Sequence, residues 1–170
     1  MKAIKIIFGV LVVLVVLFLS TGLLVKETTY QVRVEIEKPV SEVFASFSDE
    51  NAMKNWLPEI QSISPIVVKP GMVGSEYEIA VRTNDRDATI IKKVLAYIPN
   101  QKITFYFDSQ NVLKTDDYTF NEKNGTTFMI KDVSCKSESY IINCMFPYIK
   151  GFFRDMDQDQ MDKFRAYIEN

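Results

Sequence analysis

The chain has 170 residues, a net charge of −2 and a sequence pI near 5.3. Surfaces that bind nucleic acid usually carry a basic excess, so this charge argues against a nucleic-acid partner. Histidine is absent from the sequence, which excludes histidine-dependent catalytic triads, histidine-ligated zinc and imidazole general bases.

An uncharged apolar run extends from Ile6 to Val25 near the start of the chain. At 1.5 Å per residue, a helix of this length spans a hydrocarbon core ~30 Å thick. A cleaved signal peptide is the alternative, but the run is longer than a usual signal core and no clear A-x-A site follows it. We predict an uncleaved transmembrane anchor in residues 1–27 and one further domain in residues 28–170.

Lysines flank this apolar run unequally. Lys2 and Lys5 precede it, and by the positive-inside rule they place the N-terminus in the cytoplasm. Lys26 follows the run and makes the asymmetry modest. We therefore expect a single-pass protein whose domain lies outside the cytoplasm.

The predicted domain begins with a half-buried strand, Thr29–Lys38, in which apolar and polar side chains alternate. Pro39 ends this strand, because proline has no N–H to donate and suits the start of a helix. Two short helices follow, Val40–Phe47 and Glu50–Trp56, the first with its apolar side chains on one face.

Six further strands are expected, and the turns between them are short. Sequential strands joined in this way predict an antiparallel sheet. Pro65 interrupts the first of the six, which places that strand at an edge or a bulge. The polar residues Thr83–Arg86 are expected to form one of the turns. The predicted strands are Ile60–Val68, Ser75–Arg82, Ala88–Ile98, Lys102–Asp108, Val112–Glu122 and Thr126–Ser134.

The last two strands are predicted to form a hairpin around Asn124-Gly125, a dipeptide typical of tight turns. A three-residue loop, Lys123–Gly125, places apolar side chains of both strands on one face. The same register brings two carboxylates together. It pairs Phe120 with Phe128, Tyr118 with Ile130 and Asp116 with Asp132.

The C-terminal residues Tyr148–Ile168 are predicted to form one long amphipathic helix, with Pro147 near its start. A helix with so apolar a face needs a large apolar surface, which the strands supply. We therefore expect an α+β domain in which a curved sheet wraps around this helix. The apolar face consists of Ile149, Phe152, Phe153, Met156, Phe164, Tyr167 and Ile168.

Five segments carry a resemblance to a known family: VRVEIEKPVSEVFASFSD, NAMKNWLPEI, PGMVGSEYEI, YIPNQKITFYF and the C-terminal helix, in this order. Together they cover about Tyr30–Asn170. The sequence resembles the START-like or helix-grip superfamily, also called SRPBCC. Within it, the sequence is similar to the polyketide cyclase/dehydrase-like group and to its bacterial branch with an N-terminal membrane helix.

The resemblance implies a curved antiparallel sheet of about seven strands that grips a long C-terminal helix, with an apolar cavity between them. Two short helices follow the first strand. Relatives bind lipids, sterols, polyketides and similar hydrophobic molecules, and some are enzymes. No invariant catalytic motif of the group transfers to this sequence. The bacterial branch implies an inner-membrane location, with the domain on the periplasmic or extracytoplasmic side.

Asp116 and Asp132 are weak candidates for catalysis. If both point inward, two carboxylates share an apolar site, and one of them acquires a raised pKa suited to acid–base chemistry. The alternative is that the strand ends twist into solvent, or that Lys114 or Lys92 pairs with these carboxylates.

Residues on the inner faces of the sheet and the helix are candidates for the wall of a ligand cavity. Gln160 lies in the middle of the helix's apolar face and Asp157 near its edge, and buried polar groups need partners. Each side chain could bond a ligand, or else a sheet side chain or water. The candidates are Trp56, Tyr77, Phe105, Tyr118, Phe128, Met156, Gln160 and Phe164.

We expect no cofactor and no metal site. Cys135 and Cys144 are too widely spaced for CxxC chemistry and too few for structural zinc. They could form a disulfide in an oxidising compartment or remain two small buried thiols. Asp155, Asp157 and Asp159 resemble the opening of a calcium loop, but the glycine and terminal glutamate of that loop are missing.

These observations predict a membrane-anchored domain that binds a hydrophobic small molecule or lipid between its sheet and its C-terminal helix. Two alternatives remain open. One is a cyclase- or dehydratase-type enzyme that uses inward carboxylates. The other is a non-catalytic interaction module with a filled core.

Overall fold

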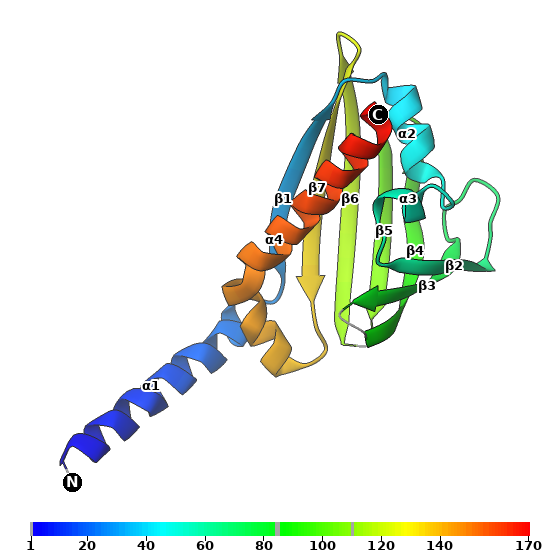
Figure 1. Cartoon of the computed structure of the whole chain (residues 1–170). Coiled ribbons are helices and arrows are strands. Elements are labelled where there is room, and N and C mark those ends of the chain that lie inside the picture. The colour runs from blue at the N-terminus through cyan, green and yellow to red at the C-terminus, as the bar shows by residue number, and fades with distance from the viewer. Residues whose placement is uncertain (1, 84–85, 110) are drawn as a thin grey trace.

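Four helices and seven strands make up the described part of the chain (Figure 1), in a computed structural model that describes residues 2–83, 86–109 and 111–170. The turn expected at Thr83–Arg86 falls on residues 84 and 85, outside the described residues. The elements are α1 (Lys2–Leu24), β1 (Thr28–Ile36), α2 (Val40–Ser48), α3 (Met53–Trp56), β2 (Ile60–Val67), β3 (Glu76–Thr83), β4 (Arg86–Ile98), β5 (Lys102–Ser109), β6 (Val112–Lys123), β7 (Thr126–Lys136) and α4 (Tyr140–Glu169).

The strands form one antiparallel sheet in the order β1-β7-β6-β5-β4-β3-β2. The first strand of the chain therefore pairs with the last at one edge. Pro65 lies in β2 at the opposite edge, where register shifts interrupt the pairing with β3 and the missing proline N–H is tolerated. This confirms the edge position predicted from Pro65.

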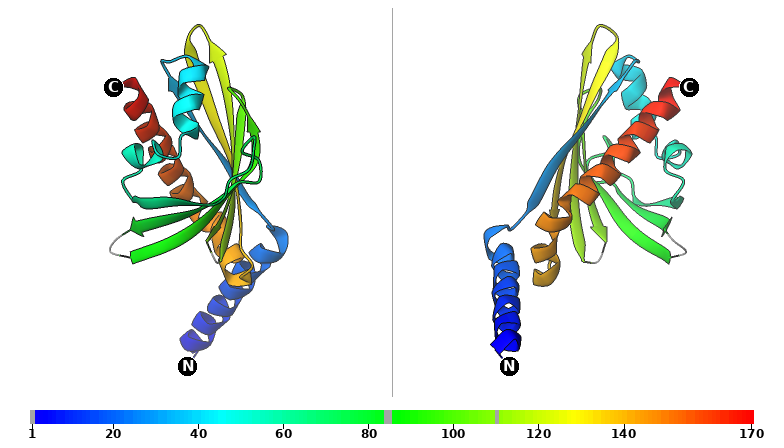
Figure 2. Two further views of the ribbon diagram at one scale, coloured as in Figure 1. Left: turned by 90° about the vertical axis from the view of Figure 1, so that its right-hand side faces the viewer. Right: turned by 60° about the vertical axis from the view of Figure 1, so that its left-hand side comes forward.

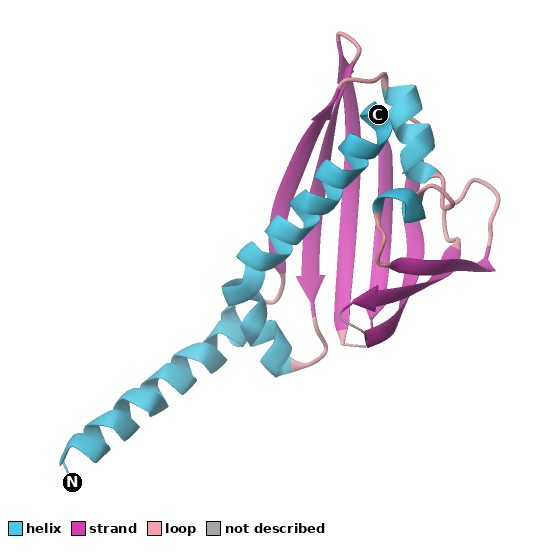
Figure 3. Cartoon of the chain, in the orientation of Figure 1, coloured by secondary structure: helices cyan, strands magenta, loops and turns pink. Residues whose placement is uncertain are grey.

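Helix α4 lies diagonally across one face of the sheet, and α2 and α3 cover part of the same face (Figures 1 to 3). The side chains between these layers form the core. Phe164 of α4 is fully buried, with ring centroids 5.2 Å from Phe47 and 5.1 Å from Trp56. The α+β arrangement of a curved antiparallel sheet around a long C-terminal helix is confirmed.

Helix α1 points away from the sheet (Figure 1) and has no buried residue. Its length and composition are sufficient for it to cross a membrane. Its C-terminal part contacts the first turns of α4.

Helix α4 begins at Tyr140, about two turns before the predicted start, so that Pro147 lies inside the helix. The Asn143 side chain explains the earlier start. Its Oδ1 accepts a hydrogen bond from the Ser137 N–H, and its Nδ2 donates one to the Ser137 carbonyl. The first turns run at an angle to the rest of α4 (Figure 1), as expected where proline removes a helical hydrogen bond.

The hairpin between β6 and β7 has a two-residue turn, so the predicted three-residue loop was wrong. Asn124 and Gly125 both have positive φ, 54° and 79°, as the common two-residue hairpin turn requires. Lys123 pairs with Thr126 across this turn. The register differs from the prediction by one residue, which reverses the faces of β7. Met129, Lys131, Val133 and Cys135 point inward, whereas Phe128, Ile130 and Asp132 do not.

Gly125→Ala should lower the free energy of unfolding by about 1 kcal/mol, because alanine resists the left-handed backbone that this turn needs. Denaturant titration of the full chain in detergent measures the effect. Gly151→Ala is the matched control. A Cβ at Gly151, inside α4, meets no atom within 4 Å, so this substitution should be neutral or slightly stabilising. Equal losses in both variants would contradict the turn assignment.

Candidate functional site

A cavity of about 250 Å³ lies between the sheet and α4. Small-molecule sites usually measure ~300–1,000 Å³, so this cavity suits a small molecule or a single acyl chain better than a whole two-chain lipid. Its wall combines side chains from α2, α3, the strands β2 to β6 and α4. The apolar lining residues are Phe47, Met53, Trp56, Leu57, Ile60, Ile79, Val81, Ile90, Phe105, Phe107, Val112, Tyr118 and Met156.

Polar side chains form one part of this wall. Lys114 and Asp116 come from β6, and Asp157 and Gln160 come from α4. Asp157 is fully buried and Gln160 is half-buried. The wall also includes Glu59, just before β2, and Ser109, at the end of β5. The cavity therefore has a mostly apolar wall with its main polar group at β6 and α4, a combination usual in sites that orient a hydrophobic ligand.

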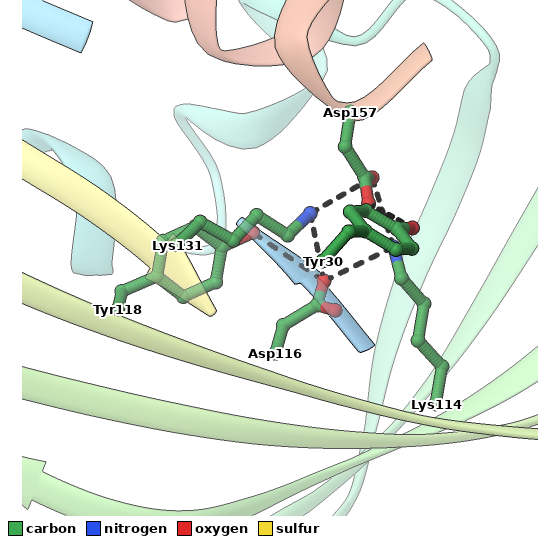
Figure 4. A network of polar contacts seen from close by, with 6 residues as sticks. All are labelled: Tyr30, Lys114, Asp116, Tyr118, Lys131 and Asp157. Carbon is green, nitrogen blue, oxygen red and sulfur yellow. Dashed lines mark hydrogen bonds and ion pairs between the residues drawn. The ribbon is translucent and has the colours of Figure 1, made fainter. Parts of the chain in front are cut away.

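The charged side chains of this polar region belong to a largely buried network of charges (Figure 4). The Lys131 Nζ atom is 2.9 Å from both Asp116 Oδ2 and Asp157 Oδ1. The Lys114 Nζ atom is 2.8 Å from Asp157 Oδ1 and 3.3 Å from Asp116 Oδ2. Two ammonium groups thus alternate with two carboxylates, and the formal charges cancel. We call these four residues the ion network.

Two tyrosines border the ion network. Tyr30 of β1 donates a hydrogen bond of 2.6 Å to Asp157 Oδ2, and the Tyr118 hydroxyl lies 3.5 Å from Asp116 Oδ2. Burial, together with the neighbouring carboxylates, raises the pKa of both phenols well above the ordinary value. Both hydroxyls therefore stay protonated and act as donors.

Ionisation inside the network is a balance of opposing effects. Burial disfavours the charged form of Asp157, but the charges of Lys131 and Lys114 and the hydrogen bonds to its carboxylate outweigh burial and lower its pKa. Burial also disfavours the charged form of Lys131. Here Asp116 and Asp157 outweigh burial and raise the pKa of the lysine. The salt bridge between Asp157 and Lys131 is therefore ionised around neutral pH.

Two buried polar atoms of lining residues have no hydrogen-bond partner among the described residues: Asp116 Oδ1 and Trp56 Nε1. The first is an acceptor and the second is a donor. A buried polar atom without a partner loses about 1–3 kcal/mol of solvation. Both atoms belong to residues of the cavity wall but have almost no accessible surface, so a side-chain movement is needed before a molecule in the cavity can bond them.

A second buried lysine lies on the inner face of β4. Lys92 is fully buried and pairs with Glu50, in the connection between α2 and α3. Its Nζ lies 4.8 Å from the ring centroid of Tyr77 and 4.7 Å from that of Phe105. Burial lowers the pKa of Lys92, although Glu50 opposes this effect. The pair ties the α2–α3 segment to the sheet next to the cavity wall.

Both cysteines are buried, and neither is in a disulfide. Burial raises the pKa of the Cys135 thiol to about 11. A thiol with such a pKa is protonated at neutral pH and is a poor nucleophile. The structure therefore has the second arrangement considered above, two separate buried thiols.

The sequence matches no family model and no curated protein. Several solved structures of other proteins are similar in fold to this chain. A START superfamily protein from Mycobacterium smegmatis has a TM-score of 0.70 at 14% identity, with 83% of this chain and 97% of that chain covered. The di-domain ARO/CYC protein BexL of the BE-7585A biosynthetic pathway has a TM-score of 0.68 at 13% identity, with 85% and 51% covered. The steffimycin-pathway ARO/CYC protein StfQ also has a TM-score of 0.68, at 10% identity, with 84% and 51% covered.

This chain has the START-like helix-grip fold. Identities this low establish the fold alone. In this helix-grip domain α4 is the gripped helix, and it carries both Asp157 of the ion network and Gln160 of the cavity wall.

Five of the residues predicted for the cavity wall line it: Trp56, Phe105, Tyr118, Met156 and Gln160. Three others have different positions. Tyr77 is buried beside Lys92, and Phe164 is buried in the aromatic core. The predicted place of Phe128 was wrong, because the hairpin register turns it away from the inner face.

The predicted Asp116–Asp132 pair does not form. Asp116 lies opposite Val133, and Asp132 is exposed, where it accepts a hydrogen bond of 2.8 Å from Gln31. Asp116 instead pairs with lysines, as in the alternative that named Lys114. Asp157 likewise bonds sheet side chains.

Sequence reasoning missed Lys131, the centre of the ion network. The signal was present in the Asn-Gly turn. A two-residue loop puts Lys131 on the same face as Met129 and Val133 and opposite Tyr118. Tyr30 lies on the buried face of the predicted first strand, but the partner of its hydroxyl depends on the position of α4 on the sheet, which the sequence pattern does not give.

Lys131→Met should destabilise the protein by about 3–5 kcal/mol, because it leaves two buried carboxylates with one lysine. The double variant Lys131→Met, Asp116→Asn removes one charge of each sign and should lose much less. Lys163→Met breaks an exposed pair with Asp159 on α4 and is the surface control, expected to change stability by no more than about 1 kcal/mol. Denaturant titration compares the variants. A double variant as unstable as Lys131→Met alone would argue against charge balance.

The lowered pKa of Asp157 predicts an acid-sensitive contribution to stability. Its carboxylate contributes fully above the ordinary carboxyl pKa of ~3.9 and loses this contribution as the pH falls toward the lower folded-state value. The stability difference between the natural protein and Asp157→Asn should be constant from about pH 5 to neutrality and shrink below about pH 4. Unfolding measured across this range checks the sign, and a difference that grows in acid would refute it.

Proposed function

We propose that this protein is a membrane-anchored binding domain for a small hydrophobic molecule that carries a polar group. The observation that carries the proposal is the cavity itself, an apolar pocket of about 250 Å³ with Lys114, Asp116 and Gln160 in one part of its wall. Apolar burial supplies the affinity, at ~25 cal/mol per Å² of apolar surface removed from water. The polar region orients the molecule.

The unpartnered atoms of the wall suggest which polar groups the ligand carries. Asp116 Oδ1 can accept a hydrogen bond, so a hydroxyl or amine donor suits it, and Trp56 Nε1 can donate to a carbonyl or hydroxyl oxygen. The ion network is already balanced in charge, so a neutral ligand avoids the cost of burying a further net charge. A neutral ring compound or fatty alcohol with one or two oxygen atoms fits these conditions.

The N-terminal helix supports the membrane part of the proposal. None of its residues is buried, and its length and composition suit a membrane span. A free apolar helix of this kind needs lipid around it in order to avoid water. The orientation that follows from Lys2 and Lys5 places the binding domain outside the cytoplasm, at the surface of a bacterial inner membrane.

The two other function classes have less support. A cyclase or dehydratase that uses Asp116 or Asp132 retains one candidate, because Asp116 lines the cavity. Asp116 is, however, paired with Lys131 and Lys114, and Asp132 is on the exposed face. An interaction module with a filled core does not explain the cavity. The ARO/CYC neighbours come from the BE-7585A and steffimycin biosynthetic pathways, so this fold also occurs in proteins of biosynthesis.

Native mass spectrometry of the protein released from its own membrane should detect a bound small molecule. Ile90→Trp places a larger side chain in the cavity wall and should abolish this bound species. Leu95→Trp is the matched control on the same strand, where the side chain is exposed and outside the cavity, and it should retain the species. An adduct that persists in Ile90→Trp would place the binding site elsewhere, and an empty natural protein would count against binding.

Trp56→Phe tests the polar contact in the same experiment. It keeps an aromatic ring in the wall but removes the Nε1 donor. Loss of one hydrogen bond worth about 1 kcal/mol should weaken binding about fivefold. Unchanged retention would show that the indole N–H does not contact the ligand.

A further inference from the structure

The C-terminal end of α1 packs closely against the first turns of α4. The Phe18 and Tyr148 rings stack with centroids 5.9 Å apart, and Thr21 Oγ1 lies 2.8 Å from the Tyr148 hydroxyl. Tyr140 donates a hydrogen bond to the Leu19 carbonyl. These contacts fix the position of the start of α4 along the axis of α1.

Gly22 makes this close packing possible. A Cβ at this position would lie 2.5 Å from Cys144 Sγ and 2.9 Å from the Tyr140 ring, so any larger side chain requires the two helices to separate. Small residues allow such close approach between helices in membranes. At Gly9, farther along α1, a Cβ would meet no atom within 4 Å. The fit is therefore confined to the end of α1 beside α4.

The contact partners in α1 lie inside its apolar run. Leu19 precedes the helix end at Leu24 by five residues, which corresponds to ~8 Å along the axis. If α1 spans a bilayer, Tyr140 and Cys144, which both contact the Leu19 carbonyl, lie at the depth of its last turns. The start of α4 then cannot remain in bulk water.

The exposed side chains of this part of α4 suit such a position. Ile141, Met145, Tyr148 and Phe152 are four, three and four residues apart, a spacing that gathers them on one face. Ile141, Tyr148 and Phe152 are 60%, 63% and 68% exposed. We call these four residues the apolar stripe. Beyond Phe152, the charged residues Arg154 and Asp155 flank Met156, so the uninterrupted apolar part of this face ends there.

We propose that the apolar stripe is embedded in the lipid of the leaflet on the domain side, as a second membrane contact beside α1. The inference rests on the proposed membrane anchoring. Tyr148 then lies where tyrosine is favoured, with its ring among acyl chains and its hydroxyl near polar groups. Met156, one turn beyond Phe152, lines the cavity and is 42% exposed, so the cavity wall reaches the exposed surface of α4 next to the stripe.

Nitroxide labels on single cysteines in vesicles of phosphatidylethanolamine and phosphatidylglycerol test this contact. The buried thiols Cys135 and Cys144 are first replaced by alanine, and folding of that background is checked. Labels at Ile141 and Phe152 report on the stripe, a label at Leu14 reports on α1, and a label at Tyr167, near the other end of α4, is the matched aqueous control. Collisions with oxygen mark lipid, and collisions with a water-soluble nickel chelate mark water.

The expected result is a several-fold lower collision rate with the chelate, and a higher one with oxygen, at Leu14, Ile141 and Phe152 than at Tyr167. Chelate access at Ile141 and Phe152 with Leu14 in lipid would overturn the inference and leave the anchor intact. Chelate access at Leu14 would overturn both. Labels on the stripe that neither reagent reaches would mean that a second protein covers it, which also overturns the inference.

Gly22→Leu and Gly9→Leu separate the role of helix packing from a general change in α1. Gly22→Leu should loosen the α1–α4 contact and raise chelate access at Phe152 several-fold, while Leu14 stays in lipid. Gly9→Leu, where a side chain has open space, should change neither label. Equal behaviour of the two variants would show that docking on α1 does not hold the stripe in the lipid.

Discussion

The burial of four balanced charges beneath α4 is the constraint on which the rest of the domain depends. Each charge would lose several kcal/mol of solvation if it were buried alone, so the network is tolerable only as a set. Its members come from β6, β7 and α4, and Tyr30 adds β1. Apolar side chains tolerate small slips of a helix along a sheet. A shift of α4 by one residue, however, would rotate Asp157 by about 100° and leave Lys131 short of a partner. The pairing of these charges therefore selects one position of α4 on the sheet.

In this position, α4 has three parts that differ in chemistry. The first turns are apolar on their exposed face and pack on α1, the middle supplies Asp157 and Gln160, and the end packs Phe164 among aromatic rings. The cavity lies between the charged middle and the aromatic end. Filling it with larger side chains would improve packing, yet the fold keeps this space beside its most polar region. The proposed binding of a hydrophobic molecule rests on this combination of an apolar space and a polar region.

The sequence was sufficient to predict the order of the elements, the edge position of β2 and the gripped helix, because these follow from alternation, proline positions and amphipathic spacing. The hairpin was wrong by one residue, and in a strand a one-residue error exchanges the two faces. That error put Asp132 inside and Lys131 outside, and so gave a dyad in place of an ion network.

The start of α4 was missed because proline normally precedes a helix, whereas here the Asn143 side chain supports turns before Pro147. Partners such as Tyr30 and Asp157, 127 residues apart, cannot be deduced from local pattern.

The pairing of β1 with β7 has a consequence for how the protein is made. Gln31 and Asp132, bonded across these two strands, are 101 residues apart, so β1 stays unpaired until the chain has been synthesised through β7. Contacts at such a sequence separation slow folding, because a long loop must be closed first. Until β7 arrives, the inward side chains of β1 are uncovered. The nascent chain is thus vulnerable to aggregation and proteolysis until its C-terminal third has been synthesised.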